Sequence, residues 1–314
     1  MDHGQKQTIV LTGATGFIGS AVLKQIKDKN APIVLKRPVS NLSRIKDIKG
    51  YRCFTYETLQ EQSLLDEVKA CRPDVLIHLA WHGVEGQARN ETYQVGDNLP
   101  LALDSVKLAY ETGCKHWIGI GSQAEYGHPN CKVNEDYQTN PTTLYGKAKL
   151  TCCREALGLC QSFGMIGSWL RLFSLYGPGD SPHWLIPYLI KETLEGRSPK
   201  LTKCEQLWDY LYIDDVSKGI LSIAYTQAPG IFNLGSGKAV PLKKIVETIR
   251  ELIDPQIEPM YGAVEYRTDQ VMHLEADISK IRSSTGWNPN VGLRQGIEKT
   301  VDWFKAQRII HESL

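Results

Sequence analysis

The stretch LTGATGFIGS (residues 11–20) decides the fold predicted for this chain of 314 residues. It follows an apolar run that ends in Gly, and residues 17–26 have the apolar spacing of a helix. Gly13, Gly16 and Gly19 stand three residues apart at this junction. A strand that turns tightly into a helix needs such glycines, and the start of the helix offers free N–H groups to an anion. The pattern therefore predicts a loop that holds the pyrophosphate of a dinucleotide.

Further apolar runs alternate with helical patterns through the first half of the chain. The expected buried strands are residues 32–36, 74–81, 116–122 and 165–177, and the expected helices are residues 99–112 and about 143–163. Apolar strands separated by helices indicate a parallel sheet that is covered on both faces. We expect an α/β protein with a doubly wound parallel sheet, the Rossmann fold, whose ligands lie at the carboxyl ends of the strands.

The texture changes after Tyr176, where Gly and Pro become frequent and the segments become shorter. We expect residues 1–175 plus about 208–230 to form the dinucleotide domain. Residues of about 176–207 plus 231–314 would form a smaller C-terminal α/β lobe that binds substrate, with the chain crossing between the two more than once.

Composition excludes several classes of partner. With 36 basic and 35 acidic residues the net charge is +1, which gives no case for binding nucleic acid or a membrane surface. No apolar run is long enough to span a membrane, and the N-terminal residues lack the apolar core of a signal peptide, so we expect a cytoplasmic protein. The eight cysteines show no C-x-x-C spacing and no paired His ligands, which favours free thiols and no metal site.

The second expected strand ends with Lys36 and Arg37, and no carboxylate follows until Asp47. A site for NAD generally has Asp or Glu at this position, to bind the ribose hydroxyls. A carboxylate would repel a 2′-phosphate, whereas a guanidinium binds one. We therefore predict NADP(H) as the cofactor, with Arg37 as the main ligand of the phosphate and Lys36 assisting.

Three residues have the chemistry needed to reduce a carbonyl. Tyr145 and Lys149 lie four residues apart, on one face of a helix, and Ser122 ends the strand before them. The ordinary pKa of Tyr is about 10, so the phenol needs a nearby cation to transfer a proton well at neutral pH. We predict Tyr145 as the acid, Lys149 as the cation that perturbs it and anchors the ribose, and Ser122 as the residue that positions the carbonyl.

With these residues in place, the chain resembles the extended short-chain dehydrogenase/reductases that act on nucleotide sugars, the NAD(P)-dependent epimerase/dehydratase family. The resemblance covers nearly the whole length. The motifs that carry it are TGATGFIGS (12–20), HLAW (78–81), Ser122 with Tyr126 and Gly127, Tyr145 with Lys149, RLFSLYGPG (171–179), YLYIDDV (210–216), FNLGSG (232–237), Arg267, ADISK (276–280) and GWNP (286–289).

The resemblance also implies which residues touch each ligand. The implied cofactor contacts are Gly13, Thr15, Gly16, Phe17, Ile18, Gly19, Lys36, Arg37, Leu79, Ala80, Trp81, Asn98, Tyr145, Lys149 and Leu172. The implied substrate contacts are Trp81, Ser122, Gln123, Glu125, Tyr145, Ser174, His183, Trp184, Trp208 and Arg267, the last on the diphosphate. Family members commonly dimerise through a bundle of helices, which residues 99–112 and 143–163 would supply here. We also expect Asp215 to cap the helix that follows it.

Departures from the family's residue pattern favour one of the family's reactions over the others. The 4,6-dehydratases carry an Asp-Glu pair after the triad Ser or Thr, and here Gln123 and Ala124 stand in those places, so elimination is disfavoured. Epimerases of the family mostly hold NAD tightly, and their common Asn is Ser174 here. The prediction is NADPH-dependent reduction of the 4-keto group of a nucleoside-diphosphate 4-keto-6-deoxyhexose to a 6-deoxyhexose, for deoxysugar and surface polysaccharide biosynthesis.

Three alternatives stay open. The first is a nucleotide-sugar 4-epimerase, which needs no acid or base beyond the triad. The second is a non-catalytic sensor of NADP, a class that typically lacks the Tyr and Lys. The third is an NADPH-dependent reductase of steroid or flavonoid carbonyls, which would not need Arg267 or the GWNP tail.

Overall fold

A computed structural model describes residues 7–26 and 32–312. Its largest element is a sheet of seven parallel strands in the order β11-β7-β5-β4-β1-β2-β3. These strands are β1 (Ile9–Thr12), β2 (Ile33–Lys36), β3 (Arg52–Thr55), β4 (Val75–His78), β5 (His116–Ser122), β7 (Ile166–Leu172) and β11 (Gly230–Leu234). The order reverses between β1 and β4, which is the switch point where ligands of such sheets bind. The doubly wound fold predicted from the sequence is confirmed.

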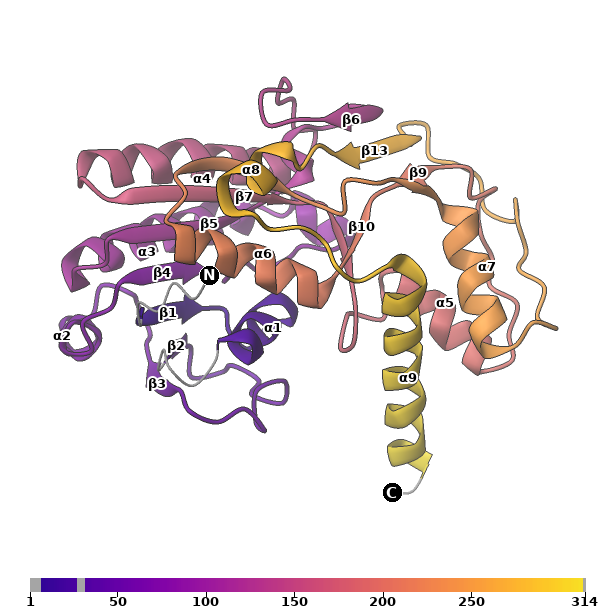
Figure 1. Cartoon of the computed structure of the whole chain (residues 1–314), viewed down its shortest axis with the longest axis horizontal. Coiled ribbons are helices and arrows are strands. Elements are labelled where there is room, and N and C mark those ends of the chain that lie inside the picture. The colour runs from indigo at the N-terminus through magenta and orange to yellow at the C-terminus, as the bar shows by residue number, and fades with distance from the viewer. Residues whose placement is uncertain (1–6, 27–31, 313–314) are drawn as a thin grey trace.

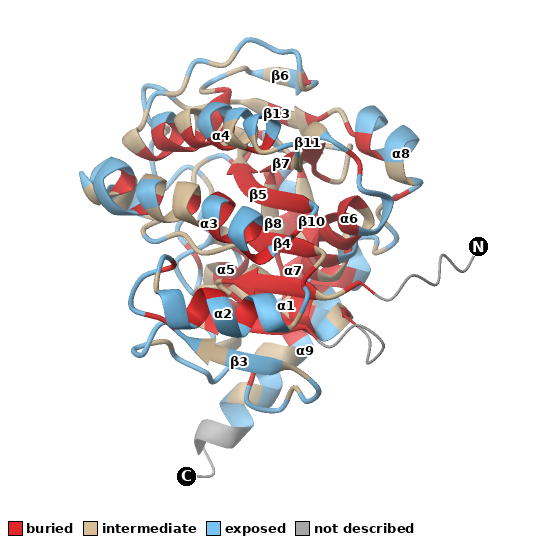
Figure 2. Cartoon of the chain, turned by 90° about the vertical axis from the view of Figure 1, so that its left-hand side faces the viewer, coloured by how far each residue is buried: buried red, intermediate tan, exposed pale blue. Residues whose placement is uncertain are grey.

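Helices cover both faces of the sheet (Figures 1 and 2). On one face lie α2 (Gln62–Ala70), α3 (Leu99–Thr112) and α4 (Leu144–Ser162). On the other lie α1 (Phe17–Gln25), α6 (Ile213–Thr226) and α8 (Ser279–Thr285). Apart from the edge strand β3, the strands that their apolar sides meet consist mostly of buried residues, and Figure 2 shows this burial concentrated in the sheet and in the inward faces of the helices. Burial on both faces is why the inner strands appear in the sequence as apolar runs.

Two smaller sheets belong to the C-terminal lobe. One pairs β8 (Ser174–Tyr176) with β10 (Tyr210–Tyr212), and the other has the order β12-β9-β13-β6. The strands of the second are β6 (Cys131–Val133), β9 (Leu207–Trp208), β12 (Val240–Pro241) and β13 (His273–Ala276). The helices α5 (Leu185–Leu194), α7 (Leu242–Ile253) and α9 (Leu293–Glu312) complete the lobe, at the right of Figure 1.

One of the expected domain limits falls at a strand of the main sheet. The limit placed at residue 230 coincides with the start of β11, and β11 pairs with β7 along its length. Residues 230–234 therefore belong to the main sheet rather than to the lobe. Residues 131–133 of the N-terminal half form β6, which pairs with β13 of the C-terminal half.

Three further observations concern disulfides, membrane-spanning helices and the helix cap expected at Asp215. None of the eight cysteines, all of them among the described residues, forms a disulfide. No helix within residues 7–26 and 32–312 has the length and apolarity of a membrane span. The expectation that Asp215 caps a helix is wrong, because α6 begins at Ile213 and the buried carboxylate of Asp215 instead accepts the backbone N–H groups of Asn290 and Val291.

Candidate active site

The glycine turn joins β1 to α1 beside the end of β4. Gly13 has a φ of +68°, and a Cβ there would lie 2.5 Å from the backbone N of Ala80. A Cβ on Gly19 would lie 2.2 Å from the carbonyl oxygen of Gly13. Gly16 precedes the first turn of α1, and no side chain caps that turn. The turn thus leaves backbone N–H groups free at a helix start, the arrangement that fits a dinucleotide pyrophosphate.

The other predicted cofactor contacts of the N-terminal half lie around this turn. Thr15, Phe17 and Ile18 are half-buried at the start of α1, and Leu79 and Ala80 follow β4 directly against Gly13. Lys36 ends β2 and Arg37 follows it, exposed, with its backbone N–H bound to Ser40 Oγ at 3.1 Å. Both cations therefore stand at the carboxyl edge of the sheet, next to the strand that carries the glycine turn.

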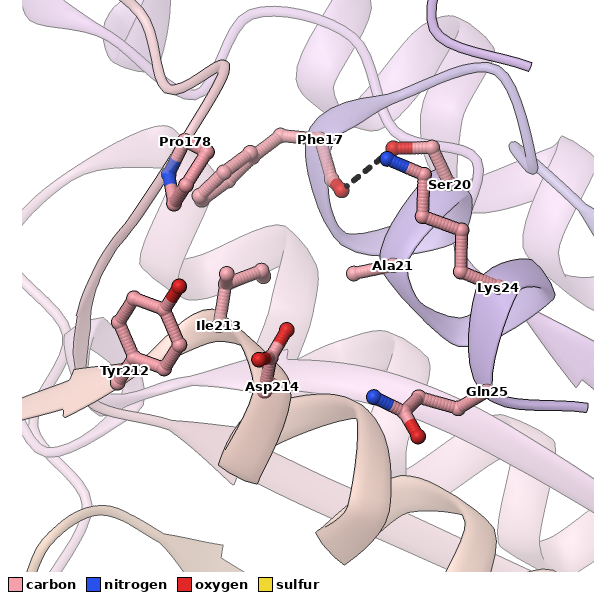
Figure 3. Close-up of a pocket in the computed structure, with 9 residues that line it drawn as sticks. All are labelled: Phe17, Ser20, Ala21, Lys24, Gln25, Pro178, Tyr212, Ile213 and Asp214. Atoms are coloured by element: carbon pink, nitrogen blue, oxygen red, sulfur yellow. Dashed lines mark hydrogen bonds between the residues drawn. The ribbon is translucent and has the colours of Figure 1, made fainter. Parts of the chain in front are cut away.

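A cavity lies behind this turn, between α1 and the start of α6 (Figure 3). Its lining residues are Phe17, Ser20, Ala21, Lys24, Gln25, Pro178, Tyr212, Ile213 and Asp214. Phe17 is one of the predicted cofactor contacts, but the cavity includes none of Ser122, Tyr145 and Lys149. It adjoins the dinucleotide loop and is separate from the catalytic groups.

The structure brings the three predicted catalytic residues together. Ser122 is the last residue of β5, and Tyr145 stands one turn before Lys149 on α4. The helix starts at this point because Thr143 Oγ1 accepts the N–H of Gly146 at 3.1 Å. Gly146 also permits close packing, since a Cβ there would lie 2.6 Å from the carbonyl oxygen of Ala124. This contact sets the phenol of Tyr145 beside the hydroxyl of Ser122.

Opposing influences act on the pKa of the Tyr145 phenol. Burial raises it, a hydrogen bond with Ser122 and the positive charge of Arg89 lower it, and the negative charge of Glu125 raises it. Arg89, which the sequence analysis missed, lies in a 3₁₀ turn, η2 (Gly86–Asn90), with its guanidinium carbon 4.9 Å from the centre of the Tyr145 ring.

Lys149 is held on two sides. Its Nζ donates to the carbonyl oxygen of Ile120 at 2.7 Å and lies 3.4 Å from the centre of the Trp81 ring. The side chain is only 3% exposed, and burial lowers its pKa to about 7 from an ordinary 10.5, against the raising effects of Cys152 and Glu125. Trp81 therefore contacts the ammonium of Lys149, the predicted catalytic lysine, a role that the sequence analysis did not assign to it.

Replacing Lys149 with Met should remove a pH dependence of folding stability. Between the folded pKa of about 7 and the ordinary value, the unfolded chain binds one more proton than the folded chain, so this lysine makes stability rise with pH. We expect the free energy of unfolding of the wild type, relative to Lys149→Met, to increase by about 2 kcal/mol between pH 7 and pH 9. Urea unfolding at a series of pH values measures this. Lys147→Met, at an exposed position of α4, is the control and should show no such trend.

The prediction that Glu125 contacts substrate is wrong. Its side chain is 0% exposed, and its carboxylate accepts hydrogen bonds from Trp169 Nε1 at 2.9 Å, Arg171 Nε at 2.8 Å and the backbone N of Ser122 at 2.9 Å. The ion pair with Arg171 is equally buried. These hydrogen bonds of Glu125 hold the end of β5, and with it the backbone of Ser122, in place.

Glu125→Gln should lower the free energy of unfolding by about 2 kcal/mol, because the buried Arg171 guanidinium loses its counter-charge. Chemical denaturation measures this loss, and Glu155→Gln, at an exposed position of α4, serves as the control. Unchanged stability together with weaker substrate binding would restore the role first expected for Glu125.

The side chains of Asn98 and Leu172, both predicted cofactor contacts, are buried in the structure. The Asn98 side chain donates to the carbonyl oxygen of His82 at 2.8 Å and accepts the N–H of His82 at 2.9 Å. Both ends of this amide are thus used in anchoring the segment after β4. Leu172 is buried at the end of β7, next to Ser122 in the sheet register.

The predicted substrate contacts lie on several segments. Gln123 is half-buried directly after Ser122, in the turn η4 (Gln123–Glu125), and His183 and Trp184 are exposed just before α5. Trp208 donates its indole N–H to Ser174 Oγ at 2.6 Å, so these two lie side by side. The Arg267 side chain is 78% exposed, and its charge is close enough to Arg89 to lower the pKa of that guanidinium. The two guanidinium groups therefore repel each other electrostatically.

Comparisons with known proteins show which family and which structures this chain is similar to. A family model described as the NAD dependent epimerase/dehydratase family matches residues 9–235. A UDP-glucuronate 4-epimerase of Thermodesulfobacterium geofontis is 25% identical, over 94% of this chain and 95% of its own. A dTDP-4-dehydro-6-deoxyglucose reductase of Escherichia coli is 26% identical, over 96% of this chain and 99% of its own.

Among solved structures, a UDP-N-acetylglucosamine 4-epimerase of Methanobrevibacter ruminantium superposes with a TM-score of 0.87. It covers 96% of this chain and 99% of its own length, at 24% identity. At that identity the likeness establishes the fold. The relatives include both reductases and epimerases, so the residues of the site have to distinguish between these reactions.

Proposed function

Because the chain belongs to the NAD-dependent epimerase/dehydratase family, we propose that it reduces the 4-keto group of a nucleoside-diphosphate 4-keto-6-deoxyhexose, using NADPH. The observation that carries the proposal is the composition of the site around Ser122. Ser122, Tyr145 and Lys149 lie close together, and the two positions after Ser122 are occupied by Gln123 and Ala124. Neither side chain can protonate a leaving hydroxyl or remove a proton from carbon 5, as elimination requires.

Each group of the triad has a defined task in the proposed reduction. NADPH, if held at the glycine turn, would supply the hydride that carbon 4 of the sugar needs. The electron pair of the C=O double bond moves to the oxygen, which takes the phenolic proton of Tyr145 and becomes a hydroxyl. Ser122 holds the carbonyl oxygen by a hydrogen bond, and Lys149 favours the phenolate that remains until solvent returns a proton.

The preference for NADPH rests on the end of β2. Lys36 and Arg37 offer two cations where a carboxylate would be needed to bind the ribose of NAD. Glycines fit the pyrophosphate at the adjacent turn, because Cβ atoms at Gly13 and Gly19 would collide with backbone. Arg267 would bind the diphosphate of the sugar nucleotide, and the Trp208–Ser174 pair would border the sugar or the base.

We infer a homodimer from the surface formed by α3 and α4. These helices pack together, and Tyr110 of α3 stacks on Phe163 at the end of α4 while half of its surface remains exposed. An aromatic side chain so exposed on a helix pair is suited to burial against the same pair of a second copy.

Incubation with NADPH and a panel of nucleoside-diphosphate 4-keto-6-deoxyhexoses tests the proposal, with product stereochemistry determined by NMR. We expect NADPH to be consumed and one 4-hydroxy epimer to form. The second candidate is a 4-epimerase, which is favoured by the names of two of the relatives compared above. Interconversion of 4-hydroxy sugar nucleotides without net consumption of NADPH would establish it and refute the reductase.

A further inference from the structure

Arg89 lies against the proposed proton donor. Its guanidinium carbon is 4.9 Å from the centre of the Tyr145 ring, the geometry of a cation–π contact. Its Nε atom is buried and has no hydrogen-bond partner among the residues that the structure describes. A buried guanidinium nitrogen without a partner is costly, so an arginine at this place needs a compensating interaction. The face of the Tyr145 ring supplies one.

The segment that carries Arg89 is held firmly in place. Gln94 is fully buried, and its Nε2 donates to the carbonyl oxygens of Gly83 at 2.5 Å and Ala88 at 2.9 Å. Next to Arg89, the side chain of Asn90 accepts the N–H of Leu144 at 3.2 Å. Leu144 is the neighbour of Tyr145 on α4. The hydrogen bond between Asn90 and Leu144 therefore sets the register of Arg89 against Tyr145.

The groups that face Tyr145 come from four elements. Ser122 of β5 is a hydrogen-bond partner, Glu125 of η4 is the nearby negative charge, Lys149 lies on α4 itself, and Arg89 comes from η2. The Lys149 ammonium is 5.8 Å from the centre of the Tyr145 ring but only 3.4 Å from that of Trp81. Much of its interaction is thus with Trp81 and with the carbonyl oxygen of Ile120.

The two cations also differ in how firmly they keep their charge. Burial lowers the pKa of Lys149 to about 7, so this ammonium is only partly charged at neutral pH. A guanidinium stays protonated at any pH at which a protein works. Arg89 is therefore the permanent positive charge beside the phenol, although burial and Arg267 lower its own pKa from the ordinary value.

We propose that Arg89 stabilises the phenolate form of Tyr145 and so shares with Lys149 the activation of the proton donor. Arg89 acts through Tyr145 and is a positioning residue in this role. The inference rests on the proposed function, since it concerns the phenol assigned there as the acid. The Lys149 ammonium lies closer to the Trp81 ring than to the Tyr145 ring, and the Arg89 guanidinium supplies a second positive charge beside the Tyr145 ring.

A titration of residue 145 tests the proposal without any substrate. A difluorotyrosine placed at position 145 ionises nearer to neutral pH than tyrosine does, and ¹⁹F NMR follows its ionisation as a single signal. We expect Arg89→Gln to raise the midpoint of this titration by about one pH unit. Arg89→Lys, which keeps a positive charge, should raise it by less, and Arg89→Met should match Arg89→Gln.

Lys147→Gln is the matched control, because it removes a positive charge from an exposed position of the same helix. It should leave the midpoint unchanged. Circular dichroism and thermal unfolding identify any variant that is not folded, and Arg89→Lys remains informative if Arg89→Gln is not. A midpoint in Arg89→Gln within about 0.2 pH unit of the wild type, or below it, would overturn the proposal. The titration needs no sugar nucleotide, so its outcome is independent of whether the 4-keto sugars prove to be substrates.

Discussion

Tyr145→Phe should lower kcat for the reduction of the 4-keto sugar nucleotide by about 1,000-fold, because it removes the phenolic hydroxyl that is hydrogen-bonded to Ser122 and is proposed to protonate the carbonyl oxygen. The ring itself remains, so its edge contact with Trp81 and the position of the Arg89 guanidinium on its face should persist. Binding of NADPH and of the sugar nucleotide should therefore change by less than about threefold. Loss of NADPH absorbance measures the rate, and calorimetry measures both affinities.

Tyr110→Phe is the control for this substitution. It also removes one phenolic hydroxyl, from a ring of α3 that stacks on Phe163 far from the proposed chemistry, and it should leave kcat unchanged. A Tyr145→Phe enzyme that kept more than a tenth of the wild-type rate would show that another group delivers the proton. Lost affinity at an unchanged kcat would instead make Tyr145 a binding residue.

The parts of the fold that could be predicted are those whose burial leaves a periodic pattern. Residues 99–112 and 116–122 were expected as a helix and a strand, and both are confirmed as α3 and β5. By contrast, β3 and α2 were missed. The sequence of β3 is RCFT, with three of its four residues exposed at the edge of the sheet, so it carries no apolar run. An edge strand is defined by its partner, which a single sequence does not show.

The residues of the candidate site likewise include some that sequence spacing predicts and others that it does not. Tyr145 and Lys149 lie one helical turn apart, so their common face follows from spacing alone. The partners of Glu125 do not follow from spacing, since Arg171 lies 46 residues away and meets it only because β5 and β7 are neighbours. The carboxylate of Glu125, close in sequence to the predicted catalytic serine, was therefore expected to be available to substrate, whereas it is fully buried.

Arg89 was missed for a related reason. The segment between β4 and α3 has no periodic pattern, and its shape depends on the buried amides of Gln94 and Asn98. A cation in an irregular segment has many possible places in space. The hydrogen bonds of Gln94, and of Asn90 with Leu144, help to bring this arginine to the ring of Tyr145, and spacing in the sequence does not reveal them.

Arg37→Asp should reverse the preference between the two nicotinamide cofactors. The substitution removes the guanidinium proposed to bind the 2′-phosphate and places a carboxylate where the ribose hydroxyls of NADH can donate hydrogen bonds to it. We expect the affinity for NADPH to fall by about 100-fold and that for NADH to rise. Fluorescence titration of each reduced cofactor gives both dissociation constants.

The surroundings of Arg37 indicate that this substitution should alter cofactor binding with little effect on the rest of the protein. Its side chain is exposed, so the change should cost little stability. Arg44, a second guanidinium in the same loop, donates to the carbonyl oxygen of Gly179 at 3.0 Å, so compensation by Arg44 would require breaking that hydrogen bond. Lys69→Asp on α2 makes the same change of charge at another exposed position and should alter neither affinity. Equal affinities of the wild type for NADH and NADPH, unaltered by Arg37→Asp, would mean that Lys36 and Arg37 face only solvent. The reaction would then have to be reconsidered as an epimerisation with bound NAD.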